Sequence, residues 1–188
     1  MARGRGNGRA NALGRQIVVR TEERSEASPE AVYALLSDPR SHLTWAGERQ
    51  SKKTRLLSVD APEGPVGVGS EFTTTGADPL GSFADRSVVT EAAPGRTLEF
   101  VTEARLHTKK GRDVDWTNVH RYELHPDGSG TKIVNEVTIA RISELPGMLA
   151  VFKIPLLSGL AVKASAGVAR RGVKNLARMA EEGASRPA

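Results

Sequence analysis

Apolar and polar residues alternate along most of the chain between residues 16 and 142. A period of two is typical of a β-strand that buries one face, so the pattern predicts a sheet. Short Gly- and Pro-rich turns separate most of these segments, and turns of this kind join antiparallel strands. The predicted strands are Gln16–Arg24, Lys52–Val59, Ser70–Thr75, Phe83–Glu91, Thr97–His107, Asp115–Leu124 and Thr131–Ile139.

Two short helices are predicted between the first strand and the second. Ser28 is a good N-cap and Pro29 takes the first helical position, a combination that starts a helix. The helix ends at Asp38, because the proline that follows disfavours the helical conformation in the residue before it. A second short helix is expected over about residues 40–46, and it carries Trp45.

The period changes to that of a helix over Leu156–Glu182. One stripe of this helix is apolar or small, and it contains Leu157, Ala161, Ala164, Val168, Gly172, Leu176 and Met179. Such a helix needs an apolar partner, and the sheet is the one available. Asn175 projects into the middle of the stripe. Small residues with one polar group suit a helix that borders a cavity, but close helix–sheet packing with Asn175 bonded locally explains the same pattern.

Together these elements predict an α+β fold. Its expected architecture is a curved antiparallel sheet of about six to seven strands that grips a long C-terminal helix, with two short helices after the first strand. A sheet of this many strands tends to curl. The C-terminal helix would then close its concave side.

Composition narrows the chemistry that this fold can carry. The chain has 188 residues, enough for one domain with a substantial core, and it contains no cysteine. Disulfides, thiolate metal sites and cysteine nucleophiles are therefore excluded. The four histidines share no ligand spacing, so no metal site is predicted. The sequence also lacks a Gly-rich phosphate loop and a serine nucleophile motif, and no cofactor is expected.

The formal net charge of +5 arises mainly at the N-terminus. Residues 1–16 contain four Arg and no acid, and they are too polar to fold alone. We expect residues 1–16 to be a disordered Arg/Gly-rich tail, residues 17–182 to be the folded domain, and residues 183–188 to be a second disordered tail. The domain itself is nearly neutral, so it is not expected to bind nucleic acid. The charge of the Arg-rich tail suits weak contact with RNA or with an anionic membrane surface, and the favoured alternative is a solvated tail of minor function.

No segment has the roughly twenty uninterrupted apolar residues of a membrane-spanning helix. The N-terminal tail also lacks the apolar core of a secretory signal. A cytoplasmic location is therefore expected.

The strand Asp115–Leu124 carries the clearest candidate site. Its alternation places Trp116, Asn118, His120 and Tyr122 in one row on the inward face. Asn135 of the next strand lies on the same side, among apolar neighbours, as in a small-molecule site. His120 and Tyr122 are candidate acid–base residues. The alternative is that they bond only to each other or to water inside a core. His42, near Trp45, is expected on the surface of its helix, and the alternative is a place at the rim of the cavity.

Several short motifs occur in an order that resembles a known family. A small residue and a proline open a helix that ends in Asp, and a Trp follows some seven residues later. The matching residues are Ala27–Glu30, Val32, Tyr33, Leu36, Asp38, Pro39 and Trp45, then Val68–Gly69 before Phe72, Val89–Glu91 before Pro94, Tyr122–Leu124 before Thr131, and Leu176 and Glu181. Over about Gln16–Glu182 the chain resembles the START-like or helix-grip superfamily (SRPBCC), which includes polyketide cyclases, dehydratases and lipid-transfer proteins.

The resemblance implies an elongated hydrophobic cavity between the sheet and the last helix, and it implies no single reaction. Three hypotheses follow. The first is a carrier or binder of a hydrophobic small molecule, either a lipid or a polyketide-like compound. The second is a polyketide cyclase or dehydratase that uses acid–base residues in the same cavity. The third is an interaction module that acts through the basic face of the last helix. The predicted ligand-binding residues are Trp45, Phe72, Phe100, Trp116, Asn118, His120, Tyr122, Asn135, Ala164, Val168 and Asn175.

Overall fold

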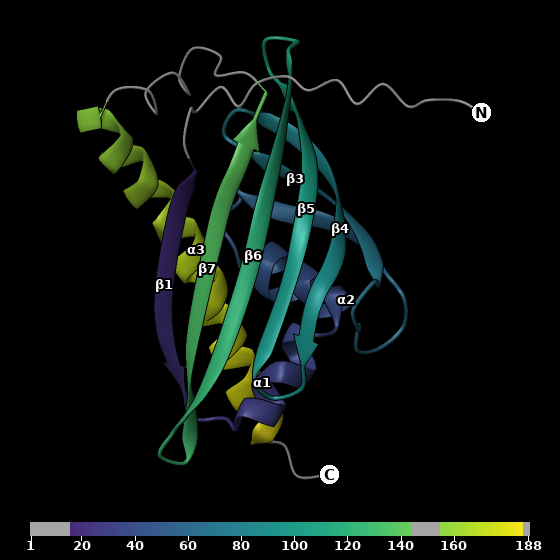
Figure 1. The fold of residues 1–188 in the computed structure, drawn as a ribbon, viewed down its shortest axis with the longest axis vertical. Helices are drawn as coiled ribbons and strands as arrows, with labels where there is room; N and C mark the ends of the chain where they lie inside the picture. The colour runs from purple at the N-terminus through teal and green to yellow at the C-terminus, as the bar shows by residue number, and fades with distance from the viewer. Residues whose placement is uncertain (1–15, 144–154, 186–188) are drawn as a thin grey trace.

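The protein is built around one seven-stranded antiparallel sheet (Figure 1). The computed structural model describes residues 16–143 and 155–185, and for residues 155–165 it describes the backbone. The strands are β1 (Ile17–Ser25), β2 (Arg55–Asp60), β3 (Glu71–Asp78), β4 (Gly81–Ala93), β5 (Thr97–Thr108), β6 (Asp113–Asp127) and β7 (Gly130–Ile142). Their order in the sheet is β1-β7-β6-β5-β4-β3-β2. Strands β2 to β7 therefore form a continuous meander, and β1 completes the sheet beside β7.

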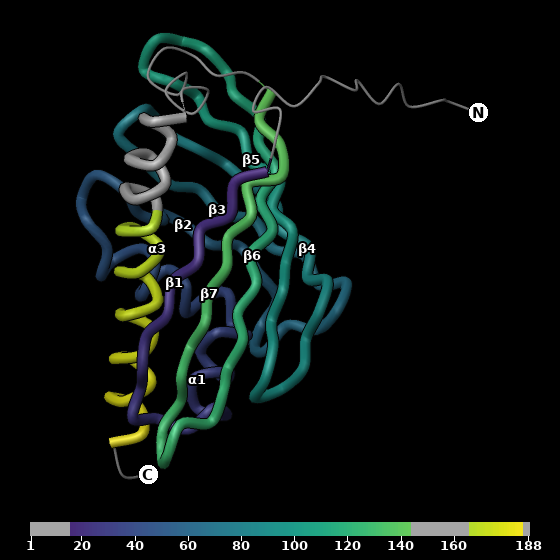
Figure 2. The backbone as a smooth tube through the Cα atoms, turned by 60° about the vertical axis from the view of Figure 1, so that its left-hand side comes forward, coloured from purple at the N-terminus to yellow at the C-terminus, as the bar shows by residue number. Residues whose placement is uncertain are grey.

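The helices lie on the concave side of this sheet. They are α1 (Pro29–Leu36), α2 (Pro39–His42), the π-helix η1 (Leu43–Glu48) and α3 (Pro155–Ala184). Figure 2 shows that α3 runs beside β1, while β2 and β3 lie beyond it at the far edge of the curved sheet. Helix α3 packs against β1, α1 and η1. The predicted α+β fold, with two short helices after the first strand and a long C-terminal helix, is confirmed.

Local sequence explains where these elements begin and end. The inward positions of β1 are Ile17, Val19 and Thr21, which are buried as their alternation predicts. Ser28 caps α1, because its Oγ accepts a hydrogen bond from the backbone N–H of Ala31 at 3.3 Å. The predicted helix over residues 40–46 differs in form: α2 has four residues, and a wider π-helical turn continues from it.

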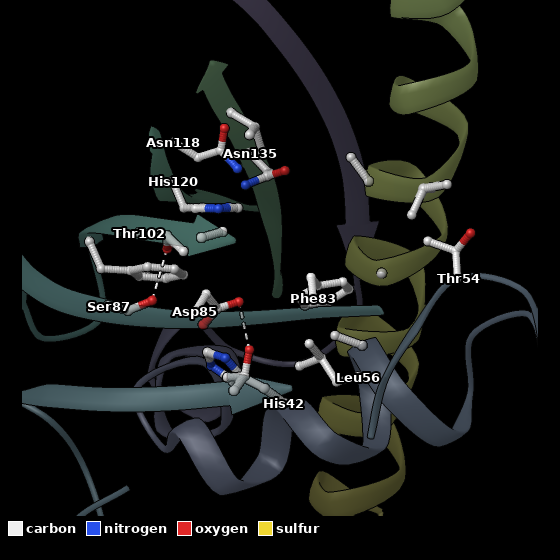
Figure 3. Close-up of a pocket in the computed structure, with 18 of the residues that line it drawn as sticks. His42, Thr54, Leu56, Phe83, Asp85, Ser87, Thr102, Asn118, His120 and Asn135 are labelled. Atoms are coloured by element: carbon white, nitrogen blue, oxygen red, sulfur yellow. Dashed lines mark hydrogen bonds between the residues drawn. The ribbon is translucent and has the colours of Figure 1, made fainter. Parts of the chain in front are cut away.

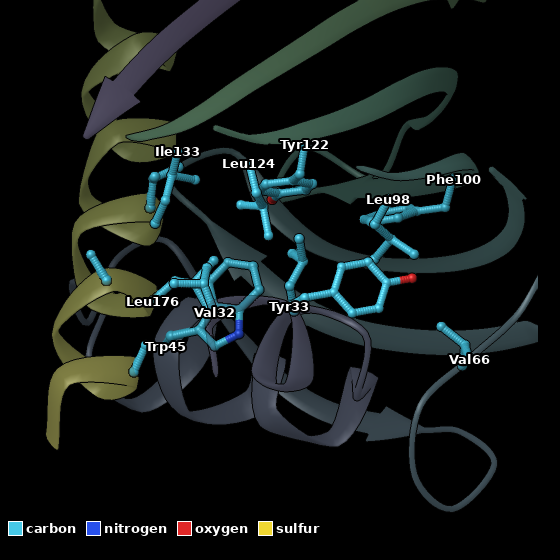
Figure 4. Close-up of a cluster of buried hydrophobic side chains, with 14 of the residues drawn as sticks. Val32, Tyr33, Trp45, Val66, Leu98, Phe100, Tyr122, Leu124, Ile133 and Leu176 are labelled. Atoms are coloured by element: carbon cyan, nitrogen blue, oxygen red, sulfur yellow. The ribbon is translucent and has the colours of Figure 1, made fainter. Parts of the chain in front are cut away.

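The described residues form two buried hydrophobic clusters, and the smaller one surrounds Leu106, Val114 and Ile142. The larger cluster packs α1 and the C-terminal half of α3 against one end of the sheet (Figure 4). Leu36 of α1, Leu98 of β5, Ile133 of β7 and Leu176 of α3 are all fully buried there. Burying a side chain of this size stabilises the fold by about 1.5–3 kcal/mol. This end of the molecule therefore anchors α1 and α3 to the sheet.

Most of the two predicted tails, residues 1–15 and residues 186–188, lies outside the described residues. Helix α3 continues to Ala184, so the first two residues of the predicted C-terminal tail are helical. Among the helices that the structure describes, none combines the length and the hydropathy needed to cross a membrane.

Candidate functional site

A cavity of about 440 Å³ lies beyond the core, between α3 and the inner face of the sheet (Figure 3). Each of the seven strands contributes at least one side chain to its wall, and α2, η1 and the middle of α3 contribute the rest, together with the segment between η1 and β2. A volume of this size is typical of sites that bind small molecules.

Nine of the eleven predicted ligand-binding residues line this cavity. They are Trp45, Phe72, Phe100, Trp116, Asn118, His120, Tyr122, Asn135 and Val168. The other two are Ala164, whose side chain lies outside the described residues, and Asn175, which is not among the lining residues. The lining supports the predicted location of the site, and the role of each residue in binding stays a prediction.

Asn175 has a structural partner instead. Its Nδ2 donates to the backbone carbonyl of Trp45 at 3.0 Å and to that of Arg49 at 2.9 Å. Both carbonyls belong to η1 or its C-terminal cap. The polar residue in the apolar stripe of α3 thus holds the π-helix in place, and through it the Trp45 side chain.

The strand register arranges the cavity floor in rows. Ser87 of β4, Thr102 of β5 and Asn118 of β6 are direct cross-strand neighbours. The Oγ of Ser87 and the Oγ1 of Thr102 are hydrogen-bonded at 2.8 Å. The Oδ1 of Asn118 is buried without a hydrogen-bond partner. This row of polar groups crosses a floor that is otherwise largely apolar and aromatic.

The next row is aromatic. Phe100 of β5 faces His120 of β6 in the register, and their rings stack with centroids 4.9 Å apart and planes at 14°. The His120 ring lies at the cavity wall (Figure 3). Among the described residues, no hydrogen bond to its ring nitrogens is found. His120 and Tyr122 are therefore not bonded to each other, and their bonding to water and their role as acid–base residues stay predictions.

His42 was expected on the surface, and this expectation is wrong. Its side chain is buried, and its Nε2 is 2.9 Å from the backbone carbonyl oxygen of Leu36. The His42 ring contacts Trp45 at a centroid distance of 4.6 Å and Phe72 at 5.9 Å. Helix α2 has too few residues to show an apolar face in the sequence, so periodicity could not place His42 inward.

Asp85 is the main site residue that sequence reasoning missed. It lines the cavity from β4, and its Oδ2 accepts a hydrogen bond from the Thr74 hydroxyl at 2.7 Å. Its Oδ1 is buried without a partner. The signal was present in the alternation, because Asp85 has the same parity as Phe83 and Val89. A charged residue in a strand is usually placed on the solvent face, which concealed it.

Burial shifts the pKa values of the ionisable groups in the cavity. Desolvation lowers the pKa of His42 to about 4, and it lowers the pKa of His120 to about 4 with a further contribution from the nearby His42. Desolvation also raises the pKa of Tyr122 and raises that of Asp85 to about 6, although hydrogen bonds from Thr74 oppose the shift at Asp85. At neutral pH both imidazoles and the phenol are uncharged, and Asp85 is mainly ionised.

The comparisons with known proteins agree with the fold. Residues 16–181 match the family model described as polyketide cyclase/dehydrase and lipid transport. A comparison with curated proteins finds no match. Among solved structures, the protein TTHA0849 from Thermus thermophilus is similar with a TM-score of 0.61 and 18% identity, covering 90% of this chain and 100% of its own.

Two further solved structures have the same fold. SA2116 from Staphylococcus aureus, a protein of unknown function, has a TM-score of 0.62 at 11% identity over 92% of this chain and 98% of its own. CV1439 from Chromobacterium violaceum has a TM-score of 0.57 at 16% identity over 87% and 96%. At these identities the structures establish the fold, and the family model covers nearly the whole folded part. The chain therefore belongs to the polyketide cyclase/dehydrase and lipid transport family, within the START-like helix-grip superfamily.

Proposed function

We propose that the protein binds a hydrophobic small molecule in the cavity between α3 and the sheet. The observation that carries this proposal is the cavity of about 440 Å³ itself, whose wall is largely apolar. A ligand that buried about 200 Å² of apolar surface there would gain about 5 kcal/mol before the costs of association. The unpaired oxygens of Asp85 and Asn118 would orient it.

Contacts within the wall of the cavity hold its side chains in place. Cross-strand hydrogen bonds such as Ser87–Thr102 and ring stacking such as Phe100–His120 hold the side chains against the sheet. Asn175 fixes η1 from the helix side. A preorganised site of this kind loses little conformational freedom on binding, so more of the apolar burial contributes to affinity.

Ligand capture by native mass spectrometry of freshly purified protein is the direct test, together with titration of a neutral hydrophobic dye such as Nile red. We expect one dye molecule per chain. The substitution Ala169→Leu places a larger side chain on the cavity side of α3 and should weaken dye binding by about tenfold or more. The same substitution at Ala184, an exposed position of the same helix, is the matched control and should leave binding unchanged.

The proposal fails if the dye does not bind and the purified protein carries no small molecule. It also fails if Ala169→Leu and Ala184→Leu bind the dye equally well, because the dye would then lie elsewhere.

A second candidate function is acid–base catalysis in the same cavity, as in a cyclase or dehydratase. Asp85 supports it, because a carboxyl with a pKa of about 6 is close to the range in which a group both gives and takes protons near neutral pH. His120 and Tyr122 support it less, since burial keeps both uncharged at that pH. An enzyme would lose turnover of a poly-β-keto substrate in Asp85→Asn while still binding it, whereas a carrier shows no turnover in either form.

The basic face of α3 offers less support for the third hypothesis. Arg171, Lys174 and Arg178 are exposed, as charged residues on the solvent side of a helix usually are. Arg170 forms an ion pair with Glu23 at 3.5 Å, which reduces its availability to a partner. We therefore place the function in the cavity.

A further inference from the structure

The aromatic residues of this chain are concentrated in its cavity. The sequence contains two Trp, two Tyr and four Phe residues, and six of these eight line the cavity. They are Trp45, Phe72, Phe83, Phe100, Trp116 and Tyr122. Four of the six, Trp45, Phe72, Phe100 and Tyr122, also pack into the core cluster. Of the other two aromatic residues of the chain, Tyr33 lies in that cluster without lining the cavity, and Phe152 lies outside the described residues. Aromatic rings present negative faces, so a cavity enclosed by them attracts positive charge as well as apolar groups.

Asp85 is the single acidic residue in the described lining of this cavity. Thr74 satisfies one of its oxygens, and the other has no hydrogen-bond partner. Among the residues that the structure describes, no Lys, Arg or His lies within ion-pairing distance of either oxygen. A carboxylate placed in an apolar wall without a counter-ion is costly, and a bound cation would offset that cost.

The other ionisable side chains of the lining leave this charge uncompensated. They are His42 from α2, Arg55 from β2, and His120 and Tyr122 from β6. Both histidines and the tyrosine are uncharged at neutral pH. In the sheet, Arg55 of β2 pairs with Ala77 of β3, whereas Asp85 of β4 pairs with Thr74 of β3. Ala77 and Thr74 are three residues apart, about 10 Å along the strand, so Arg55 and Asp85 are separated by this offset in addition to the width of two strand spacings.

The register also leaves room beside the carboxylate. Asp85 of β4, Ala104 of β5 and Trp116 of β6 are successive cross-strand neighbours. Neighbouring strands are about 4.8 Å apart, so the carboxylate and the indole stand roughly 10 Å apart across the small side chain of Ala104. A group above Ala104 would have a negative charge on one side and an aromatic ring on the other. An ammonium group fits both neighbours.

We propose that the preferred ligand is a hydrophobic organic cation, such as an amine with an aromatic body, whose ammonium group pairs with Asp85 while its body lies against the aromatic wall. This proposal rests on the proposed function of the cavity and specifies the chemistry of its ligand. A carboxylic acid of the same shape is disfavoured by repulsion from Asp85. A neutral alcohol can donate one hydrogen bond, but it leaves the charge of Asp85 unbalanced.

Three ligands of similar shape test the proposal: naphthylmethylamine, naphthylmethanol and naphthoate, each titrated at neutral pH by calorimetry. We expect the amine to bind about tenfold or more tighter than the alcohol, and the alcohol to bind tighter than the acid. This comparison uses the unmodified chain, so it stands even if a variant folds poorly. The proposal is overturned if the alcohol or the acid binds as tightly as the amine.

The substitution Asp85→Asn should remove the preference for the amine over the alcohol, while the alcohol itself still binds. Glu103→Gln is the matched control, because Glu103 is exposed on the neighbouring strand β5 and its substitution changes the net charge equally. That control should keep the full preference. Retention of the preference in Asp85→Asn would overturn the role of Asp85. Failure of all three ligands to bind would instead count against the proposed function of the cavity as well.

Discussion

Helix α3 and the sheet meet in two adjoining regions, the filled core beside α1 and the cavity beyond it. Four aromatic residues belong to both: Trp45, Phe72, Phe100 and Tyr122. In the core, Val173, Leu176 and Ala180 of α3 are at most 2% exposed. One to two turns earlier, Val168 is 41% exposed although it lines the cavity. One helix therefore changes from a packing element to a wall along its length.

The side chains opposite the helix change in the same way. Away from the rings that it shares with the cavity, the core side of the sheet presents branched aliphatic residues such as Leu98, Leu124 and Ile133. In the cavity the sheet presents rings and hydrogen-bonded hydroxyls, which are held against the sheet by one another. The side chains that line the cavity must therefore be fixed by neighbours on the sheet, because α3 does not contact them across the open space.

The largest expected difference between the two regions is the loss of stability when an apolar side chain of α3 is truncated. Leu176→Ala leaves a space in the filled core and should lower the free energy of unfolding by about 2–5 kcal/mol. Val168→Ala removes atoms that already face open space, and we expect a change below about 0.5 kcal/mol. Chemical denaturation of both variants measures this. Equal losses would mean that the two regions are packed alike.

A pH series on Asp85→Asn should give the next largest effect. The folded protein holds the pKa of Asp85 at about 6, above its ordinary value of 3.8, because burial disfavours the charge. Between these two values the folded state binds more protons than the unfolded state at this site. The contribution of Asp85 to stability is therefore present below about pH 4 and is lost as the pH rises through about 6, by at most about 3 kcal/mol.

The free energy of unfolding of the unmodified protein, relative to that of Asp85→Asn, should thus fall between about pH 4 and pH 6. Above and below this window the difference between the two proteins should stay constant. His42 and His120 titrate in the opposite sense, since their pKa values are lowered to about 4 and their contributions are lost as the pH falls. Both proteins contain both histidines, so these contributions cancel in the difference. A constant difference from about pH 4 to 7 would show that Asp85 is well solvated.

Asn175 joins the two regions, and its removal should cost less than that of Leu176. Asn175→Ala leaves the carbonyls of Trp45 and Arg49 without their donor, and we expect a loss of about 2 kcal/mol. Asn175→Asp keeps the shape but cannot donate, so it should cost at least as much. Lys174→Ala, on the exposed side of the same turn, is the control and should be nearly neutral. If Asn175→Ala is neutral too, these hydrogen bonds do not hold η1.

The fold could be predicted from sequence because its signals are local and repeated. The alternation in β1 and the Ser28–Pro29 helix start each specify an element through neighbours a few residues away. The row of Trp116 to Tyr122 was predictable for the same reason, since the parity of one strand places all its members on one side. The assignment of this strand therefore predicts one row of the cavity wall.

The remaining site residues depend on contacts that no local pattern records. His42 lies at the end of a helix of only four residues that continues into the π-helix η1, and neither element shows a periodicity that would place the side chain inward. Asp85 is inward because the cavity tolerates a carboxyl that a filled core would exclude. Asn175 was placed correctly on the buried stripe, but the carbonyl of Trp45 that it binds is 130 residues away in sequence. Distant partners of this kind are found only in three dimensions.

The smallest expected effect concerns the ion pair that closes the filled end. Arg49 donates to both carboxylate oxygens of Glu182, at 3.1 and 2.7 Å, and so links the end of η1 to the last turns of α3. Glu182 is 59% exposed, so solvent screens much of the attraction, and Arg49→Gln should cost about 0.5 kcal/mol. The loss should shrink at about 1 M salt, where screening is nearly complete. Binding of the dye in the cavity should not change, because the link lies in the filled region, and a weakened cavity in Arg49→Gln would show that the two regions are coupled through η1.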